Sequence, residues 1–254
     1  MRQDLNISLI HATVLIEQTN DEGRKFFGTG WIVDLSEAGV KKTALVTAFH
    51  VFDQMLGNEI MLNWRREDEN KIWHLEPKNH SIRDKTGNPL WYKHPDFDIA
   101  VIVINAPIAS KKAAIPLSWL ADENTLLEYE IGPADELLAL GYPRGLSANK
   151  MGFPILRSGR VASYPLSPII TFPTFLMDFA VFTGNSGGPV YLSDRVRKRR
   201  GASETHEAHL VMGLLVQQVE LSQTRLEIGI VIHAQYVRDA LNSLIQKETG
   251  FLAV

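Results

Sequence analysis

The amino-acid sequence predicts an all-β protein, and two observations support this prediction. Short segments rich in β-branched and aromatic residues recur along the chain, bounded by glycine, proline, asparagine and serine. The spacing of an amphipathic helix is almost absent until residues 234–245, where four apolar residues share one face. They are Val237, Leu241, Leu244 and Ile245. We therefore expect many short strands followed by one C-terminal amphipathic helix.

The totals limit the kinds of protein that this chain can be. Its 254 residues are 45% hydrophobic, which is enough to bury a full core. The net charge of −3 argues against general nucleic-acid binding, because neutralising phosphates requires a basic face. The absence of cysteine excludes disulfides and thiolate metal sites, and it suits a reducing compartment. No segment is apolar enough to cross a membrane, and residues 1–11 include an acid and a histidine where a signal peptide requires apolar residues. We expect a cytoplasmic protein.

Turn-forming residues divide the first half of the chain into short segments. We expect strands at residues 7–17, 25–33, 43–50, 59–64, 71–75 and 98–104, with one helical turn at 51–56. Gly28 and Gly30 interrupt the second of these strands, which indicates a bulge or the close approach of another backbone. The charged run 65–70 joins two strands of a hairpin, and we interpret it as a solvated loop tip.

The second half follows residues 107–133, which show few regular patterns and several turn-forming residues. Its expected strands are residues 136–141, 155–163, 168–171, 175–182, 189–192, 210–217 and 225–232. Both halves therefore show short strands with turns between them, and neither shows the long periodic segments of a helical domain.

Residues 183–190 have the composition of a nucleophile turn, Thr-Gly-Asn-Ser-Gly-Gly-Pro-Val. A serine that attacks a carbonyl needs backbone N–H groups beside it, aimed at the oxygen that becomes negative. A glycine two residues before Ser186 lets the chain turn so that the N–H groups of Gly184 and Ser186 converge. A glycine-rich hairpin with an incidental serine would have the same composition. The nucleophile is favoured because the partners that such a serine requires lie upstream.

Those partners are His50 and Asp98. His50 ends an apolar strand, and Asp98 opens another after the turn-forming residues 94–96. The histidine would accept the proton of the Ser186 hydroxyl, and the aspartate would fix the imidazole tautomer and stabilise its cation. Taken alone, His50 is equally explained as a core histidine and Asp98 as a strand-start cap. Their chain order, His50, Asp98, Ser186, is that of the chymotrypsin-like triad and not of subtilisin or the α/β-hydrolases.

In this order the motifs resemble those of trypsin/chymotrypsin-fold serine peptidases, closest to the bacterial HtrA (Deg)-type or trypsin-2 branch. The matching segments are Gly28-Thr29-Gly30-Trp31-Ile32-Val33, Thr47-Ala48-Phe49-His50, Asp98-Ile99-Ala100-Val101, Leu140-Gly141-Tyr142-Pro143 and Gly184-Asn185-Ser186-Gly187-Gly188-Pro189. The resemblance implies two six-stranded antiparallel Greek-key β-barrels followed by the C-terminal helix. It divides one peptidase domain, 1–254, into barrels at 1–115 and 135–232, a linker at 116–134 and a helix at 233–246, which leaves no room for a PDZ domain.

The resemblance also implies a serine endopeptidase with no cofactor and no metal. Its oxyanion hole would consist of the Gly184 and Ser186 backbone amides. Its substrate pocket would be lined by Ala180, Leu215, Val216, Gln217, Gln218 and Gly229. An aspartate at the position of Ala180 would select Lys or Arg, so this pocket is expected to favour small or medium apolar side chains. Asp178 is close in sequence, but strand alternation does not decide where it points.

Two departures from the digestive relatives concern regulation. Phe49 stands where the family has a small residue, so we expect tighter or shifted packing around His50. Asn185 replaces an aspartate that pairs with a newly cut N-terminus, and an amide cannot form that salt bridge. HtrA-type relatives also carry asparagine here and are regulated by loop ordering. We expect the resting enzyme to be held back at turn 183–185 or loop 161–174, and a regulatory protein partner to release it.

Three other features receive structural interpretations. His94 is a rival base near Asp98, but its Pro-Asp context favours an exposed turn. His206 and His209 have the spacing of one helix face, which could bind a metal, yet the preceding Gly, Ser and Thr favour a surface loop. The basic run 195–201 is interpreted as a solvated loop between strands. Its functional alternatives are docking to an acidic partner and self-cleavage.

The expected activity is cleavage of protein substrates, with neither nucleic acid nor membrane as a partner. A catalytically silent pseudo-protease that acts as a binding module is one alternative. Failure of a fluorophosphonate probe to label folded protein would favour it. A serine hydrolase that acts on esters is another alternative, and a comparison of peptide and ester substrates distinguishes it.

Overall fold

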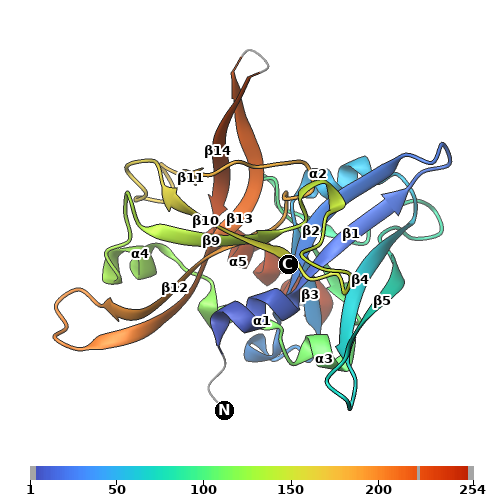
Figure 1. Cartoon of the computed structure of the whole chain (residues 1–254), viewed down its shortest axis with the longest axis horizontal. Coiled ribbons are helices and arrows are strands. Elements are labelled where there is room, and N and C mark those ends of the chain that lie inside the picture. The colour runs from blue at the N-terminus through green and yellow to red at the C-terminus, as the bar shows by residue number, and fades with distance from the viewer. Residues whose placement is uncertain (1–3, 222–223, 251–254) are drawn as a thin grey trace.

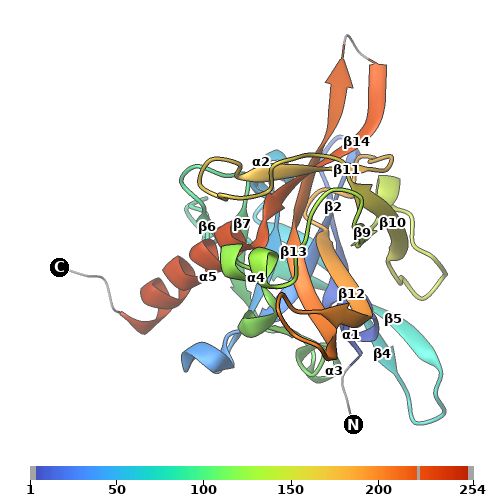
Figure 2. The same ribbon diagram turned by 90° about the vertical axis from the view of Figure 1, so that its left-hand side faces the viewer.

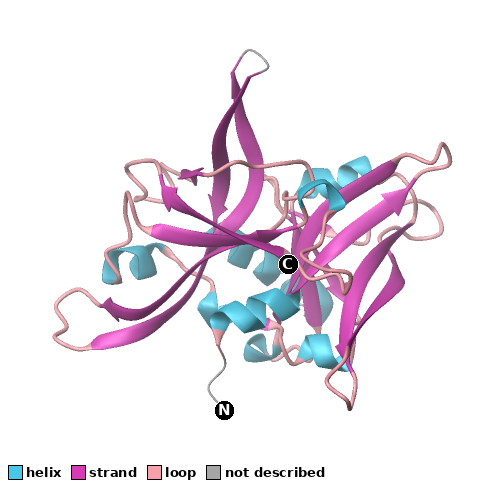
Figure 3. Ribbon diagram, in the orientation of Figure 1, coloured by secondary structure: helices cyan, strands magenta, loops and turns pink. Residues whose placement is uncertain are grey.

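Figure 1 shows the computed structural model, which describes residues 4–221 and 224–250 of the chain. Strands dominate and form two sheets, and short helices lie between and beside them (Figure 3). The prediction of an all-β fold with a C-terminal helix is confirmed.

The first sheet contains eight strands in the order β5-β4-β1-β2-β3-β7-β6, and β8 pairs in parallel with β2. They are β1 (Thr13–Thr19), β2 (Lys25–Asp34), β3 (Thr43–Thr47), β4 (Glu59–Glu67), β5 (Trp73–Ser81), β6 (Tyr92–Lys93), β7 (Ala100–Ile104) and β8 (Ile115–Pro116). We expected six strands in a closed barrel here, whereas the sheet has eight strands and β5 and β6 lie at the two ends of its strand order. The chain between β5 and β6 forms a polar loop, in which Asp84 accepts the N–H groups of Thr86 and Asn88 at 2.8 and 2.9 Å.

The second sheet is the closed antiparallel barrel of six strands that we expected, in the order β10-β11-β14-β13-β12-β9. Its strands are β9 (Glu136–Gly141), β10 (Ile155–Val161), β11 (Thr174–Asp178), β12 (Pro189–Lys198), β13 (Thr205–Leu221) and β14 (Thr224–His233). Residues 168–171 form part of the turn before β11 and not a strand, and β11 ends at Asp178 rather than at residue 182. The β12–β13 and β13–β14 hairpins extend away from the barrel (Figure 1).

The helices are short except at the C-terminal end. They are α1 (Leu5–Ala12), α2 (Phe49–Gln54), α3 (Ile108–Lys111), α4 (Glu123–Glu128) and α5 (Ala234–Thr249), with 3-10 turns η1 (Ser36–Ala38), η2 (Leu117–Trp119) and η3 (Pro143–Gly145). Helix α5 is the predicted amphipathic helix, and Val237, Leu241 and Leu244 on one face are buried. It contacts both β7 and β13, so it connects the two sheets (Figure 2).

The prediction of a first strand at residues 7–17 is wrong in part, because these residues divide between helix α1 and the start of β1. Asp4 caps the helix, and its carboxylate accepts the N–H groups of Asn6 and Ile7 at 2.8 and 3.3 Å. Leu5 and Leu9, four residues apart, are buried on the same face. The β-branched residues of the segment suggested a strand, but the cap and this buried face favour the helix.

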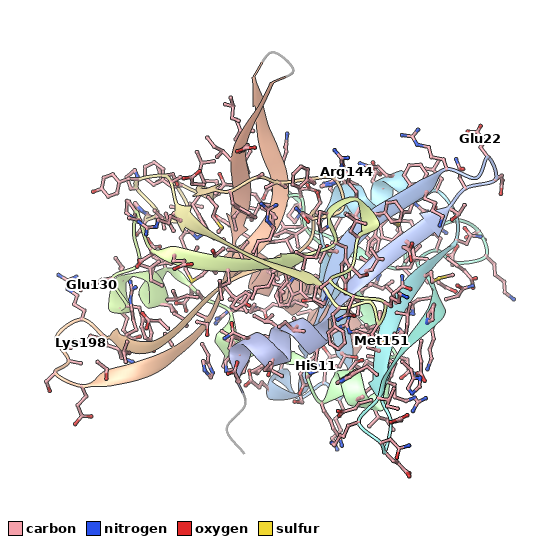
Figure 4. All side chains as sticks on the ribbon, viewed as in Figure 1. His11, Glu22, Glu130, Arg144, Met151 and Lys198 are labelled. Atoms are coloured by element: carbon pink, nitrogen blue, oxygen red, sulfur yellow. The ribbon has the colours of Figure 1, made fainter. Side chains whose placement is uncertain are left out.

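The interpretation of residues 65–70 as a solvated loop tip is wrong for Arg65. It lies inside β4 and is 5% exposed. Its guanidinium donates at 2.6 to 3.1 Å to the carbonyls of Ile10, His11, Thr13 and Gly152 and to the hydroxyl of Tyr142. The first two carbonyls belong to the last turn of α1, where a cation is favourable. His11, one of these acceptors, and Met151, which directly precedes Gly152, are labelled in Figure 4.

The basic run is also more structured than expected. Strand β12 continues to Lys198, on the hairpin at the left of Figure 4, so residues 195–198 are not a loop. Arg197 forms two hydrogen bonds with the Asp135 carboxylate, at 2.6 and 2.9 Å, and donates to the carbonyl of Tyr129. The side chain of Lys198 is exposed. The solvated-loop interpretation is therefore wrong for Arg197.

His206 and His209 lie in β13 and not in a surface loop. Their backbones pair with Arg197 and Ser193 of β12, respectively. The ring of His209 lies 5.1 Å from that of Trp119. Within residues 4–221 and 224–250, no helix has the length and apolarity to span a membrane.

Candidate active site

His50 and Asp98 meet because their strands pair. Strands β3 and β7 are antiparallel, with Thr47 opposite Ala100, so the residues just beyond these positions emerge at one edge. His50 lies in the first turn of α2, directly after β3. Asp98 Oδ2 lies 2.6 Å from His50 Nδ1, and Oδ1 accepts the His50 backbone N–H at 2.8 Å. The aspartate therefore fixes both the ring and the backbone of the histidine.

Asp98 has a pKa below its ordinary value of 3.8, although burial acts in the opposite direction and is the largest single influence. The hydrogen bond and charge of the His50 ring, together with the backbone N–H groups of His50 and Phe49, outweigh that burial. The carboxylate is thus ionised at neutral pH and accepts the hydrogen on Nδ1. This leaves Nε2 as the basic nitrogen of a neutral His50 ring.

Ser186 lies in the turn between β11 and β12 and lines the same cavity as His50 and Asp98, whose volume is about 460 Å³. Its Oγ lies 3.0 Å from the carbonyl oxygen of Val216. A carbonyl only accepts, so the Ser186 hydroxyl must donate its hydrogen to Val216. In the described part of the chain, no hydrogen bond joins Ser186 to His50. The structure thus brings the three predicted residues to one cavity, but it links only two of them directly.

Val216 is available to Ser186 because of a bulge in β13. Leu215 and Gln217 pair with consecutive residues of β14, Val231 and Ile230, and Val216 is the extra residue between them. The carbonyl of a bulged residue is not used by the neighbouring strand. It can therefore turn toward the cavity.

Within residues 184–188 of the nucleophile turn, the N–H groups of Gly184 and Ser186 have no acceptor among the described residues. The other three amides of this stretch are used, since Asn185, Gly187 and Gly188 donate to the carbonyls of Phe182, Leu215 and Asn185 at 3.0, 2.7 and 3.0 Å. Gly184 has φ of +95°, and a Cβ there would lie 2.3 Å from the Tyr142 carbonyl, so only glycine fits. The two unpaired amides are those that the sequence assigned to an oxyanion hole.

Arg144 sets the orientation of the peptide before Gly184. Its backbone N–H donates to the Thr183 carbonyl at 2.6 Å. The N–H of Gly184 belongs to the same trans peptide and points the opposite way, away from Arg144. Arg144 itself has φ of +54°, which is uncommon for a residue with a side chain (it is labelled in Figure 4).

The six predicted pocket residues divide into two groups. Val216 and Gln217 line the cavity. Ala180 and Leu215 are not among its lining residues, and Leu215 is buried in the core. Gly229 pairs with Gln218 across β13 and β14. A Cβ on Gly229 would lie 2.9 Å from Phe179, 3.0 Å from Val181 and 3.2 Å from Leu215, so a side chain at this position would be crowded by these residues.

The opposite wall consists of residues that the sequence analysis did not identify. Val181, Phe182 and Thr183 line the cavity directly after Ala180, and Phe27, Val51 and Gln54 line the side nearer the first sheet. Strand β11 ends at Asp178, so alternation could not be counted through this wall. Asp178 itself is exposed and pairs with Arg160 and Ile228.

His94 is not in an exposed turn, as its sequence context suggested, but is 7% exposed. Its Nδ1 accepts the backbone N–H groups of Asp96 and Phe97 at 3.1 and 3.2 Å. Burial lowers the pKa of the ring, and Phe97 and Tyr236 pack against it. The proline and aspartate beside it do form a turn, but the turn folds over the histidine.

An eight-stranded sheet and a six-stranded barrel, joined at a cavity with an aspartate-held histidine and a serine, define a protein of the chymotrypsin-like class. The comparisons agree with this class. The chain belongs to the trypsin-like peptidase domain family, whose model matches residues 28–196. No curated protein matches the sequence significantly.

Solved structures of proteases share the fold. The HtrA-type protease AlgW with a tripeptide is 16% identical, with a TM-score of 0.58 over 96% of this chain and 63% of that one. The Rv3671c protease from M. tuberculosis, in its active form, is 17% identical, with a TM-score of 0.54 over 94% of this chain and 82% of that one. Protease Anisep from Arthrobacter nicotinovorans is 13% identical, with a TM-score of 0.54 and coverages of 93% and 96%. The chain thus spans less than two thirds of the AlgW chain, and at these identities the likeness concerns the fold alone.

Proposed function

We propose that the chain is a serine endopeptidase that cuts protein substrates through an acyl-enzyme, with His50, Asp98 and Ser186 as its triad. One observation supports this most strongly. An ionised Asp98 holds His50 by two hydrogen bonds in a cavity that also contains the Ser186 hydroxyl and two backbone amides without acceptors among the described residues. Membership of the peptidase family supports the same activity.

The reaction follows from these positions. Ser186 Oγ attacks the carbonyl carbon of the peptide while His50 Nε2 accepts the hydroxyl proton, and the carbonyl oxygen becomes negative. The N–H groups of Gly184 and Ser186 stabilise that oxygen. The imidazolium then donates its proton to the leaving nitrogen, the C–N bond breaks and the acyl-enzyme remains. Water attacks the ester with His50 again as base, which releases the acid and restores Ser186.

The Ser186 hydroxyl must leave Val216 before it can donate to His50. An extended substrate that pairs with β13 beside the cavity would place a backbone N–H at the Val216 carbonyl. That N–H would replace the serine as donor, and a rotation of the Ser186 side chain would then bring its hydrogen to Nε2. Substrate binding and alignment of the nucleophile are coupled in this proposal.

The cavity favours small or medium apolar side chains before the scissile bond. Val181 and Phe182 form one wall and Val216 part of the other. Among the described residues that line the cavity, Asp98 is the only carboxylate, and it is bonded to His50. No carboxylate is therefore free to pair with a Lys or Arg of the substrate.

A binding module without turnover is the second candidate, and the bond from Ser186 to Val216 favours it. A fluorophosphonate probe and a peptide library decide between the two. A peptidase labels at Ser186 and cleaves peptides as well as esters, whereas an esterase cleaves esters alone, and Ser186→Ala abolishes both labelling and cleavage while the fold remains. Folded wild-type protein that neither labels nor cleaves would identify the binding module.

The cytoplasmic location and the regulatory protein partner stay predictions. Control through residues 161–174 or turn 183–185 also stays a prediction, and Leu166 and Ile169 of the first segment are buried. The test is to incubate the isolated chain with a proteome as substrate and to measure the rate of cleavage. Control by a partner predicts a low rate for the isolated chain and a higher rate when cell extract is added.

A further inference from the structure

We propose that Thr29 is a positioning residue that holds the nucleophile turn in its reactive shape from the opposite sheet. This inference rests on the proposed peptidase function. Thr29 lies in β2, opposite Leu15 of β1, and is fully buried. Its backbone N–H donates to the Ser186 carbonyl at 2.9 Å, and its Oγ1 donates to the Gly184 carbonyl at 2.6 Å. One residue of the first sheet thus binds the turn on both sides of Asn185.

The two bonds act on the peptides that determine where the turn's free amides point. The Gly184 carbonyl lies in the peptide between Gly184 and Asn185, directly after the peptide that carries the Gly184 N–H. In the same way, the Ser186 carbonyl lies in the peptide directly after the one that carries the Ser186 N–H. The bond from Arg144 fixes the peptide before Gly184 at 2.6 Å. With Thr29 in place, the peptides on both sides of Gly184 are fixed. Without the hydroxyl, the buried Gly184 carbonyl would lack its donor, and this peptide would be held only by the bond from the Asn185 N–H to the Phe182 carbonyl at 3.0 Å.

A hydroxyl suits this position because it donates and accepts at once. While Oγ1 donates to Gly184, it accepts the backbone N–H of Tyr142 at 3.1 Å. Tyr142 leads into the η3 turn, whose Arg144 amide holds Thr183. The same oxygen therefore connects the two segments that surround the Gly184 amide. Valine has the same shape as threonine but can replace neither bond.

The turn is also pressed against this part of β2. A Cβ on Gly187 would lie 2.1 Å from the Thr29 carbonyl, and the Thr47 hydroxyl donates to that carbonyl at 2.7 Å. A side chain at position 187 would therefore push the turn away from β2. The alternative is that Thr29 merely satisfies its own hydroxyl, like any buried threonine. The two readings differ in what a lost hydroxyl does to the chemical step.

Thr43 provides the matched control. It lies in β3 of the same sheet, is buried, and donates its hydroxyl to the Ile104 carbonyl at 3.0 Å. Thr43→Val therefore removes one buried hydroxyl and its hydrogen bond to a carbonyl, while Thr29→Val also removes the acceptor of the Tyr142 N–H. The partner of Thr43, Ile104, does not belong to the nucleophile turn.

The experiment compares wild type, Thr29→Val, Thr29→Ser and Thr43→Val by thermal unfolding, steady-state cleavage of a fluorogenic peptide and the rate of fluorophosphonate labelling. We expect Thr29→Val to lower kcat at least ~10-fold with KM changed less than ~3-fold, because a misaligned oxyanion amide weakens binding of the transition state alone. The pH at half-maximal kcat/KM should stay constant, because the His50–Asp98 pair is untouched. Thr29→Ser should recover most of the lost kcat, and Thr43→Val should match wild type.

Each result bears on the proposal. Equal kcat for Thr29→Val and Thr43→Val in an active enzyme would overturn the role of Thr29 and leave the proposed function intact. Wild-type protein without labelling or cleavage would overturn both. If Thr29→Val does not fold, Thr29→Ala removes the same hydroxyl without adding volume, and its kcat relative to Thr29→Ser carries the same decision.

Discussion

The hydroxyl of Ser186 donates to the carbonyl of Val216, at 3.0 Å, and not to His50. The bond between His50 and Asp98, in contrast, is already formed at 2.6 Å. The contact between His50 and Asp98 is thus preformed, while the Ser186 hydroxyl is bonded elsewhere. In the proposed triad, the Ser186 side chain must rotate away from Val216 before it can donate to His50.

Asp98→Asn should lower kcat by about 10³- to 10⁴-fold with a smaller effect on KM, because an amide neither selects the imidazole tautomer nor stabilises the cation. Asp96→Asn is the control, since Asp96 is exposed on the same turn. Steady-state peptide cleavage measures both variants. Comparable losses in the two would mean that the turn as a whole, and not the Asp98 charge, supports activity.

Arg65→Met should reduce the free energy of unfolding by about 2–4 kcal/mol, because the carbonyls at the end of α1 and the Tyr142 hydroxyl lose a charged donor. Arg66→Met is the neighbouring control. Arg66 is half exposed and pairs with Glu76 on the surface, so its replacement should leave stability nearly unchanged. Denaturant unfolding compares the two variants. A similar small effect in both would show that Arg65 is not needed to hold α1.

His233 should make the fold sensitive to moderate acid. Burial is the main cause that lowers its pKa from 6.5 to about 4. The unfolded chain therefore binds a proton between these values that the folded chain does not, and stability falls as the pH drops through this interval. The full loss attributable to this ring is about 3 kcal/mol. We expect His233→Asn to be less stable at pH 7 but to lose less stability between pH 7 and pH 4. Parallel stability curves for the two proteins would contradict the assignment.

Cleavage-site profiling should show small or medium apolar residues before the scissile bond, because Val181 and Val216 face the cavity. Val181→Ala enlarges that space and should shift the preference toward larger apolar residues by several-fold, at roughly 0.8 kcal/mol per buried methylene. Val161→Ala, at the buried end of β10, controls for general loss of core packing. A dominant Lys or Arg preference in wild type would refute this account of the pocket.

Local signals predicted much of the fold. The strands that end near His50 and begin near Asp98 are continuous apolar runs bounded by turns, and α5 has an uninterrupted apolar face. Helix α1 was missed because its β-branched residues outweighed the signal of Asp4 and the spacing of Leu5 and Leu9. The burial of Arg65 could not be predicted, because its acceptors lie near residues 10–13, 142 and 152. Only the folded chain brings these segments together.

The candidate site was predictable where a residue type carries a chemical requirement. A serine between glycines, a histidine after a strand and an aspartate before one each indicate a role, and the structure brings all three to one cavity. The wall of Val181, Phe182 and Thr183 was missed because these residues follow the end of β11, where alternation no longer applies. The rotamer of Ser186 depends on a bulge at Val216, and the sequence carries no signal for it.

The division of the candidate site between two sheets has a consequence for the newly made chain. Thr29 lies in the first sheet, His50 and Asp98 lie beside the ends of its strands β3 and β7, and Ser186 lies in a turn of the barrel. The ribosome therefore releases His50 and Asp98 long before Ser186 is made. Strand β14, which closes the barrel, and α5, which contacts both sheets, are made last among the described elements. In the proposed peptidase, a half-synthesised chain would hold no complete site, so it could not cut itself or its neighbours on the same messenger.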